Sequence, residues 1–276
     1  MAKSSGIIRG AGVALAAIAL CGVAATVAFA TPSTQIWIPS TDIQPFKTLH
    51  FGADTFIRTG NESNGTNYPP FVDLGLTGGI LPFEKVQAEV GIDLMYGGAN
   101  SSANLDGNPV YFHFKVGVPE DTFFKWQPAV AVGGYNFGTK SGSLDESTGT
   151  YTKNGTNANI GYALAAKTFA PLGRFSVGYY GLNRKASVAT VYDAAGNKGD
   201  ANGVMASWDR TMTEISDKLW VAVDYMSGKN AYGATSFGAS WAFTKNLSVI
   251  LGYDIYNNKD RAGANTFTVQ VDINFP

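Results

Sequence analysis

Residues 266–275 read Thr-Phe-Thr-Val-Gln-Val-Asp-Ile-Asn-Phe, and this stretch decides how the rest of the chain is interpreted. Every odd position from Phe267 to Phe275 is apolar, and every even position from Thr266 to Asn274 is polar. Successive side chains of a β-strand point to opposite faces, so this run predicts a ribbon with one apolar and one polar face. A soluble sandwich alternates in the same way, and the recurrence of the pattern decides between the two folds.

Segments with this alternation recur along the chain, each roughly ten to twelve residues long, the length that a tilted strand needs to cross a bilayer. They lie near residues 48–59, 71–82, 85–97, 109–118, 127–138, 158–169, 174–184, 203–213, 218–228, 232–243, 247–257 and 265–275. No segment after residue 30 is apolar over even ten residues, so only a barrel can embed this chain in a membrane. The predicted fold class is all-β, a transmembrane antiparallel up-and-down β-barrel of about twelve strands.

The connections between these segments alternate in length. Short turns lie near residues 82–85, 170–173, 214–217 and 244–246. Long polar loops cover residues 60–70, 98–108, 139–157, 185–202 and 258–264, and residues 229–231 are the short exception. Outer-membrane barrels have tight turns at one edge and long loops at the other, whereas a soluble sandwich has no reason to sort its connections.

The first thirty residues have the pattern of a secretory signal peptide. Lys3 and Arg9 precede an uncharged run rich in Ala, Gly and Val, which ends in the cleavage pattern Ala28-Phe29-Ala30. We expect cleavage after Ala30; a retained membrane anchor and a lipoprotein modified at Cys21 are the alternatives. Cys21 is the only cysteine of the sequence, so the mature chain forms no disulfide or iron–sulfur centre, and no cofactor is expected.

The mature chain is predicted to have two parts. Residues 31–47 contain three prolines and no clear period, and we expect an irregular lead-in that lies in the periplasm or in the barrel mouth. Its anchors would be Ile36, Trp37 and Ile38. Residues 48–276 form the predicted barrel.

Residues 48–275 as a whole resemble a bacterial outer-membrane β-barrel of the porin-like class. The closing alternation that ends on Phe275 is similar to the C-terminal signal by which such barrels are recognised for insertion, although Pro276 follows the final aromatic residue. The resemblance implies the outer membrane of a Gram-negative bacterium, with lipid and lipopolysaccharide as surroundings.

Aromatic residues near the strand ends are expected at the two membrane interfaces, where amphipathic rings gather. They are Tyr96, Tyr111, Phe137, Phe169, Trp208, Tyr232, Trp241, Phe243, Tyr256 and Phe275.

Alternation also assigns the polar face, which encloses water if lipid touches the apolar face. The candidate pore-lining residues are His50, Asp54, Arg58, Asp73, Glu89, Asp93, His113, Lys115, Asp209, Asp224, Asp254 and Asp272. Segment 127–138 does not choose a face. The acidic side chains favour cations in an open bore; alternatively, the same groups pair across strands, and these side chains and residues 31–47 block it.

The composition and the two histidines exclude several classes of function. Only 15% of residues are charged and the net charge is −1, which argues against a nucleic-acid partner. The two histidines, His50 and His113, lack the nucleophile pairing of outer-membrane lipases, and no metal site or enzymatic activity is expected. We predict a passive channel for ions or small hydrophilic solutes with mild cation preference. The alternative is a non-conducting barrel, an adhesin or a sheath for a partner, which acts through its loops.

Overall fold

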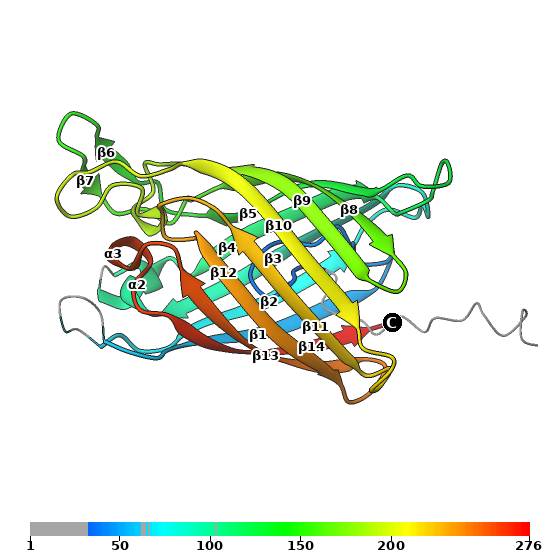
Figure 1. Cartoon of the computed structure of the whole chain (residues 1–276). Helices are drawn as coiled ribbons and strands as arrows, with labels where there is room; N and C mark the ends of the chain where they lie inside the picture. The colour runs from blue at the N-terminus through cyan, green and yellow to red at the C-terminus, as the bar shows by residue number, and fades with distance from the viewer. Residues whose placement is uncertain (1–32, 62–64, 66, 103) are drawn as a thin grey trace, which may run out of the picture.

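The computed structural model describes residues 33–276 except 62–64, 66 and 103. Strands that are neighbours around the ring pair antiparallel and close into one barrel (Figure 1). In chain order they are β1 (Leu49–Arg58), β2 (Phe71–Gly79), β3 (Gln87–Gly97), β4 (Val110–Val118), β5 (Ala129–Gly138), β8 (Ile160–Phe169), β9 (Gly173–Gly181), β10 (Asn202–Thr211), β11 (Leu219–Met226), β12 (Ala234–Ala242), β13 (Leu247–Tyr256) and β14 (Thr266–Phe275). The predicted all-β, antiparallel up-and-down barrel of about twelve strands is confirmed. The predicted signal peptide, residues 1–30, lies outside the described residues.

The barrel wall is apolar outside and polar inside. In β14 the side chain of Phe267 is 38% exposed, whereas Thr268 and Gln270 on the opposite face are 0% and 1% exposed. On the far side of the ring, Val132 of β5 and Val177 of β9 are each 62% exposed. This polarity is the reverse of that in a soluble sandwich, and hydrocarbon is the solvent that such an outer surface fits. Within the described part of the chain, no helix has the length and apolar character needed to cross a membrane.

The two ends of the barrel differ, as the loop lengths predicted. The turn end carries the short connections 80–86, 170–172, 212–218 and 243–246 and one longer connection, 119–128. The loop end carries 59–70, 98–109, 139–159, 182–201, 227–233 and 257–265. The short helices α2 (Ala99–Ser102) and α3 (Lys259–Ala262) and the 3-10 turns Leu105–Gly107 and Ser187–Ala189 lie in the loop-end connections.

Two local features depart from the sequence-based expectation. The loop predicted over 139–157 contains a small hairpin of its own, β6 (Ser143–Asp145) and β7 (Thr150–Lys153).

Strand β5 is the segment whose polar face the sequence did not assign. Its pairing with β4 shifts register between Phe112 and Phe114, and Asn136 has a positive φ of 56°. The face of residues 129–132 was ambiguous for another reason, because Ala129 and Ala131 point inward and Val130 and Val132 outward, so that both faces are apolar.

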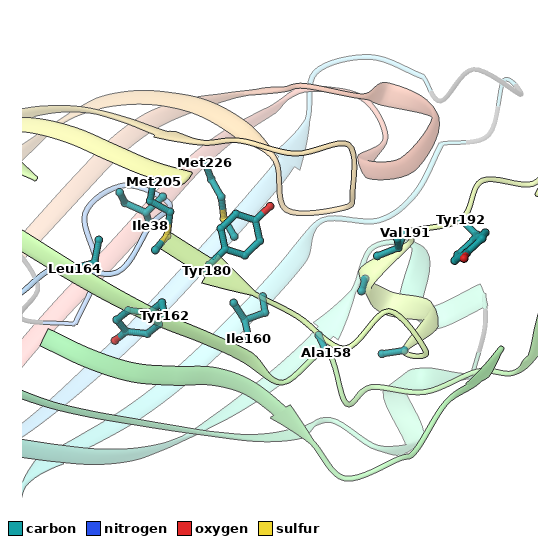
Figure 2. Packing of buried hydrophobic residues seen from close by; sticks show 12 residues of the cluster. Ile38, Ala158, Ile160, Tyr162, Leu164, Tyr180, Val191, Tyr192, Met205 and Met226 are labelled. Atoms are coloured by element: carbon teal, nitrogen blue, oxygen red, sulfur yellow. The ribbon is translucent and has the colours of Figure 1, made fainter. Parts of the chain in front are cut away.

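The interior of the barrel is filled on one side. A buried apolar cluster joins Tyr180, Met205 and Met226 of the wall to Ile38 of the lead-in (Figure 2). The cluster continues to Val191 in the loop-end connection 182–201. The lead-in therefore runs within the barrel, where its blue trace lies in Figure 1.

Candidate functional site: the bore

The bore is lined by the inner faces of the twelve strands. All twelve residues predicted for this face lie on it. Eight of them are buried, namely His50, Glu89, Asp93, Lys115, Asp209, Asp224, Asp254 and Asp272. The other four are half-buried: Asp54, Arg58, Asp73 and His113. Their partners, however, differ from one side of the ring to the other.

Residues 33–40 form a hairpin inside the barrel, called here the N-terminal hairpin. The amide of Ser40 donates to the carbonyl of Ser33 at 3.2 Å, and the amide of Gln35 donates to the carbonyl of Ile38 at 2.7 Å. Ile36 and Ile38 are 2% and 0% exposed. The hairpin lies within the barrel, deeper than its mouth, and the expected anchors Ile36 and Ile38 are buried there. Its signal in the sequence was the apolar run at 36–38.

Carboxylates of the wall hold the tip of this hairpin. One oxygen of Asp224 accepts hydrogen bonds from the backbone amides of Ile36 and Trp37, both at 2.9 Å. The side-chain amide of Gln35 donates to Asp209 at 3.0 Å. From β14, three strands away from β11 around the ring, Gln270 donates to the carbonyl of Ile36 at 2.8 Å. A buried backbone amide needs an acceptor, and a carboxylate gives the stronger, charge-assisted kind of bond.

A second set of polar contacts fixes the base of the hairpin at the turn end. Glu89 accepts from the Ser33 hydroxyl at 2.9 Å and from the amide of Gln44 at 2.6 Å. Lys115 pairs with Glu89 at 3.2 Å and also donates to the carbonyls of Ser33 and Asp42.

An ion-pair chain continues across the bore from this base. Arg174 of β9 binds Asp42 at 2.6 Å and Asp209 at 3.0 Å. Arg174 therefore offsets the negative charge of Asp42 in the lead-in and of Asp209 in the wall.

Glycines of the wall make room for apolar side chains of the hairpin. Gly238 and Gly252 are direct cross-strand partners in β12 and β13. A Cβ at Gly252 would lie 2.9 Å from the Cγ2 atom of Ile36, and one at Gly238 would lie 3.0 Å from its Cδ1 atom. Trp220, Ala222 and Ile250 complete the apolar socket around Ile36. Gly252, which lies two residues before Asp254 on the same face of β13, thus makes room for the side chain of Ile36.

A cavity of about 410 Å³ remains on the other side of the bore. It is bounded by the inner faces of β1 to β4, by Tyr135 of β5 and Tyr162 of β8, by Asp272 of β14, by the N-terminal hairpin and by loop-end residues such as Ser187 and Arg261. Its carboxylates are Asp54, Asp73, Glu89, Asp93 and Asp272. We call it the outer cavity.

Two of these carboxylates face each other directly. Asp54 of β1 and Asp73 of β2 are cross-strand partners, so their side chains stand side by side on the inner face. The Oδ1 atom of Asp73 has no hydrogen-bond partner among the described residues. Two neighbouring carboxylates repel each other, and a cation between them offsets that repulsion.

The two histidines bind other groups of the same wall. His113 lies 2.7 Å from Asp93 through Nδ1 and 2.9 Å from the Thr77 hydroxyl through Nε2. Its ring lies over Gly91, where a Cβ would be 2.0 Å from Nε2. The order acid, imidazole, hydroxyl is also that of a nucleophilic triad, but Thr77 is only 3% exposed. We interpret this series of hydrogen bonds, from Asp93 through His113 to Thr77, as a structural link across β2, β3 and β4.

His50 forms a second link of this kind between β1 and β14. Its Nδ1 atom lies 3.1 Å from the Oδ1 atom of Asn274, and its Nε2 atom lies 3.5 Å from Asp272. Within the described ranges, no group of three or more His, Cys, Asp or Glu residues is arranged to hold a metal ion.

Three of the aromatic residues expected at the membrane interfaces instead point into the barrel. Tyr111 and Tyr256 are 3% and 7% exposed and line the outer cavity, as does Tyr232. The prediction was wrong for them because nearness to a strand end does not fix the face. Parity does: Tyr256 lies two residues after Asp254, and Tyr111 two residues before His113.

Comparison with known proteins gives likeness in barrel shape only. No protein-family model and no curated protein matches the chain. Among solved structures, the KdgM porin has 8% identity and a TM-score of 0.47, covering 83% of this chain and 99% of that one. The NanC porin has 11% identity and a TM-score of 0.43, covering 82% and 99%. Outer membrane phospholipase A from Escherichia coli has 11% identity and a TM-score of 0.43, covering 85% and 94%. Likeness at this level assigns no activity to the chain.

Proposed function

We propose that this protein is a passive channel of the outer membrane of a Gram-negative bacterium, exported by a leader that is cleaved after Ala30. It passes ions or small hydrophilic solutes and has a mild preference for cations. The closed barrel with its apolar exterior supports placement in lipid, with lipopolysaccharide around the loop end. The observation that carries the cation preference is the Asp54–Asp73 pair at the wall of the outer cavity.

The acidic lining supports cations because a carboxylate in a narrow bore attracts cations and repels anions. Bases are present in the same bore, yet Lys115 pairs with Glu89, and Arg174 with Asp42 and Asp209. The Asp54–Asp73 pair faces the cavity instead. The outer cavity is lined by five carboxylates and by the three cationic side chains Arg58, Lys115 and Arg261, and this excess of acidic over basic groups supports a preference for cations.

Reversal potentials in a salt gradient across a planar bilayer test the proposal. We expect a potassium-to-chloride permeability ratio above one, and a fall of at least roughly twofold in the Asp54→Asn, Asp73→Asn double variant. Glu84→Gln, which changes an exposed carboxylate in a turn-end connection, is the matched control and leaves the ratio unchanged. Anion selectivity, or an unchanged ratio in the double variant, contradicts the acidic lining.

Asp93→Asn combined with Asp254→Asn tests two other carboxylates of the predicted lining. Asp93 lines the outer cavity and is paired with His113. Asp254 is fully buried and accepts a hydrogen bond from Thr266 at 2.7 Å. We therefore expect this pair of changes to lower cation preference less than the Asp54, Asp73 pair does.

A second candidate is a non-conducting barrel that acts through its loops as an adhesin or a partner sheath. The N-terminal hairpin favours it, because this segment occupies the bore. Silence in bilayers both with and without the hairpin, in a protein that folds and inserts, is the result that this candidate predicts. Neither candidate gives the protein an enzymatic role, a cofactor or a nucleic-acid partner.

A further inference from the structure

We infer that residues 33–44 are a detachable plug, and that the bore conducts only when this segment leaves it. The inference rests on the proposed channel function and adds a closed state to it.

The segment crosses the bore, because its partners come from strands on several sides of the ring. Glu89 and Lys115 belong to β3 and β4, Asp224 belongs to β11, and Gln270 belongs to β14. Trp37 at the tip packs against Phe56 and Tyr256 of β1 and β13, with ring centroids 5.4 and 5.6 Å apart. Ser33, Ile36 and Trp37 of the hairpin line the outer cavity, so the hairpin forms one wall of this cavity and narrows the bore between the loop end and the turn end.

The plug is bound to the barrel wall but is not one of its strands. The hairpin tip is held by side chains of the wall, whereas the strands hold one another by continuous backbone ladders. The isolated bridge between Phe46 and Gly79 is the point at which the lead-in joins the sheet. Residues 33–44 precede this bridge, so they are able to leave while β1 keeps its register with β2 and β14.

The polar groups of the wall that bind the segment are hydrated when it leaves. The carboxylates of Glu89, Asp209 and Asp224 would then face a water-filled bore, which solvates them. The glycine pair Gly238 and Gly252 would leave a groove where Ile36 now sits. Release thus joins the outer cavity to the turn end and places more carboxylates along the path, in keeping with cation passage.

Asp224 is the sharpest point at which to test attachment, because one oxygen holds two backbone amides. The chain also supplies a matched control. Asp254 lies in the same row of the sheet, since Asp224 pairs with Ser236 and Ser236 pairs with Asp254. Both carboxylates are 1% exposed or less, but Asp254 binds Thr266 rather than the hairpin.

The attachment experiment measures labelling of a cysteine within the plug. In the full chain with Cys21→Ser, Ile38→Cys places one thiol at a position that is 0% exposed. A polar maleimide is added to the folded protein in detergent. We expect Asp224→Ala to raise the labelling rate at least about tenfold, because two buried amides lose their acceptor. Asp254→Ala leaves the rate unchanged. Equal rates in the two variants overturn the inference.

Two further variants keep the test decisive if Asp224→Ala fails to fold. Ile36→Asp places a carboxylate next to Asp224 in an apolar socket and is expected to release the hairpin without touching the wall. Deletion of residues 33–44 removes the plug itself. Folding of each variant is checked by its circular dichroism and its heat-dependent migration on a gel.

Single-channel recording separates failure of the plug from failure of the channel. We expect the deletion and Ile36→Asp to show larger and more frequent openings than the parent chain. If the parent already conducts as well as the deletion while the thiol introduced by Ile38→Cys stays protected, the plug is overturned and the channel stands. A different outcome is that the thiol of Ile38→Cys becomes reactive in Asp224→Ala, whereas the deletion variant inserts but never conducts. The segment then detaches, but the conducting state and the channel function are both overturned.

Discussion

Two sides of the same bore use the same residue type in different ways. The filled side is the part of the inner face that contacts the N-terminal hairpin, mainly β9 to β12 with Glu89 and Lys115 at the hairpin base, and its carboxylates bind the hairpin, as Asp224 and Asp209 do. The open side, β1, β2 and the loop-end part of β3 around Met95, has carboxylates that border the outer cavity, as Asp54 and Asp73 do. Alternation along the strand places all four on the inner face. What differs is whether the lead-in passes in front of them.

The apolar residues of the two sides differ in the same way. Met205 and Met226 on the filled side are fully buried and belong to the cluster around Ile38. Met95 on the open side is 8% exposed and borders the outer cavity. A side chain gains most from burial when close-packed atoms surround it. The lead-in thus acts as the missing core of one half of the barrel.

The largest expected effect of this contrast is on stability, when one partner of a buried ion pair is removed. Lys115 and Glu89 are 2% and 1% exposed and 3.2 Å apart. Lys115→Met leaves the Glu89 carboxylate buried without its cation, and we expect a loss of about 3–5 kcal/mol in the free energy of unfolding. Urea unfolding of the vesicle-inserted barrel measures it.

Asp73→Asn is the matched change on the open side. This carboxylate stands beside Asp54, and its Oδ1 atom has no hydrogen-bond partner in the described part of the chain. Its neutralisation removes a repulsion, so stability stays the same or rises. A loss as large as that of Lys115→Met would show that the two sides do not differ.

The next effect in size concerns packing. Met226→Ala empties a fully enclosed site next to the hairpin cluster, and we expect a loss of about 2–5 kcal/mol. Met95→Ala enlarges a cavity that already exists, so its loss is smaller than that of Met226→Ala. The same urea unfolding compares them, and equal losses contradict the distinction between a filled and an open side.

Alternation predicted the wall of this barrel well, because period-2 polarity is a local property of each strand. It placed residues as far apart as His50 and Asp272 on the inner face, and it also contained the correct face for Tyr111 and Tyr256. It assigned no face in β5, where the inward Ala129 and Ala131 and the outward Val130 and Val132 are all apolar. The bulge near Asn136 depends on the neighbouring strand, which the local pattern does not show either.

The interior could not be predicted from the same pattern. Asp224 and Asp254 have similar surroundings in their strands, apolar neighbours on either side and the same row of the sheet. Only one binds the hairpin, because Ile36 and Trp37, which lie 188 and 187 residues earlier in the sequence, reach it. The apolar run at 36–38 indicated burial, but not where. Contacts between a lead-in and a closed wall depend on the assembled barrel.

The smallest expected effect concerns the contact that joins the two sides at the loop end. Arg261 in α3 follows β13, and it binds Asp193 at 3.2 Å and the carbonyl of Asn197 at 2.8 Å. Both partners lie in the connection 182–201, whose Val191 belongs to the apolar cluster of the filled side. The pKa of Asp193 is lowered from its usual value of 3.8, first by the backbone amide of Asn197 and also by Arg261.

A lowered pKa in the folded state means that the ionised Asp193 stabilises this connection above its usual pKa and that the stabilisation is lost as the pH falls below it. We therefore expect hydrogen-exchange protection factors for the amides of Val191 and Tyr192, which bind the Tyr151 hydroxyl, to fall between pH 6 and pH 3. Asp193→Asn lowers them at pH 6 and removes most of the pH dependence.

Asp145 supplies the control, because its pKa is lowered too, by the hydroxyl and amide of Ser147, but within the β6–β7 hairpin alone. Asp145→Asn should leave the Val191 and Tyr192 amides as they are. If it changes them as much as Asp193→Asn does, acid loosens the loop end as a whole. If only Asp193→Asn changes them, the contacts of Asp193 with Asn197 and Arg261 hold the connection over the filled side in place.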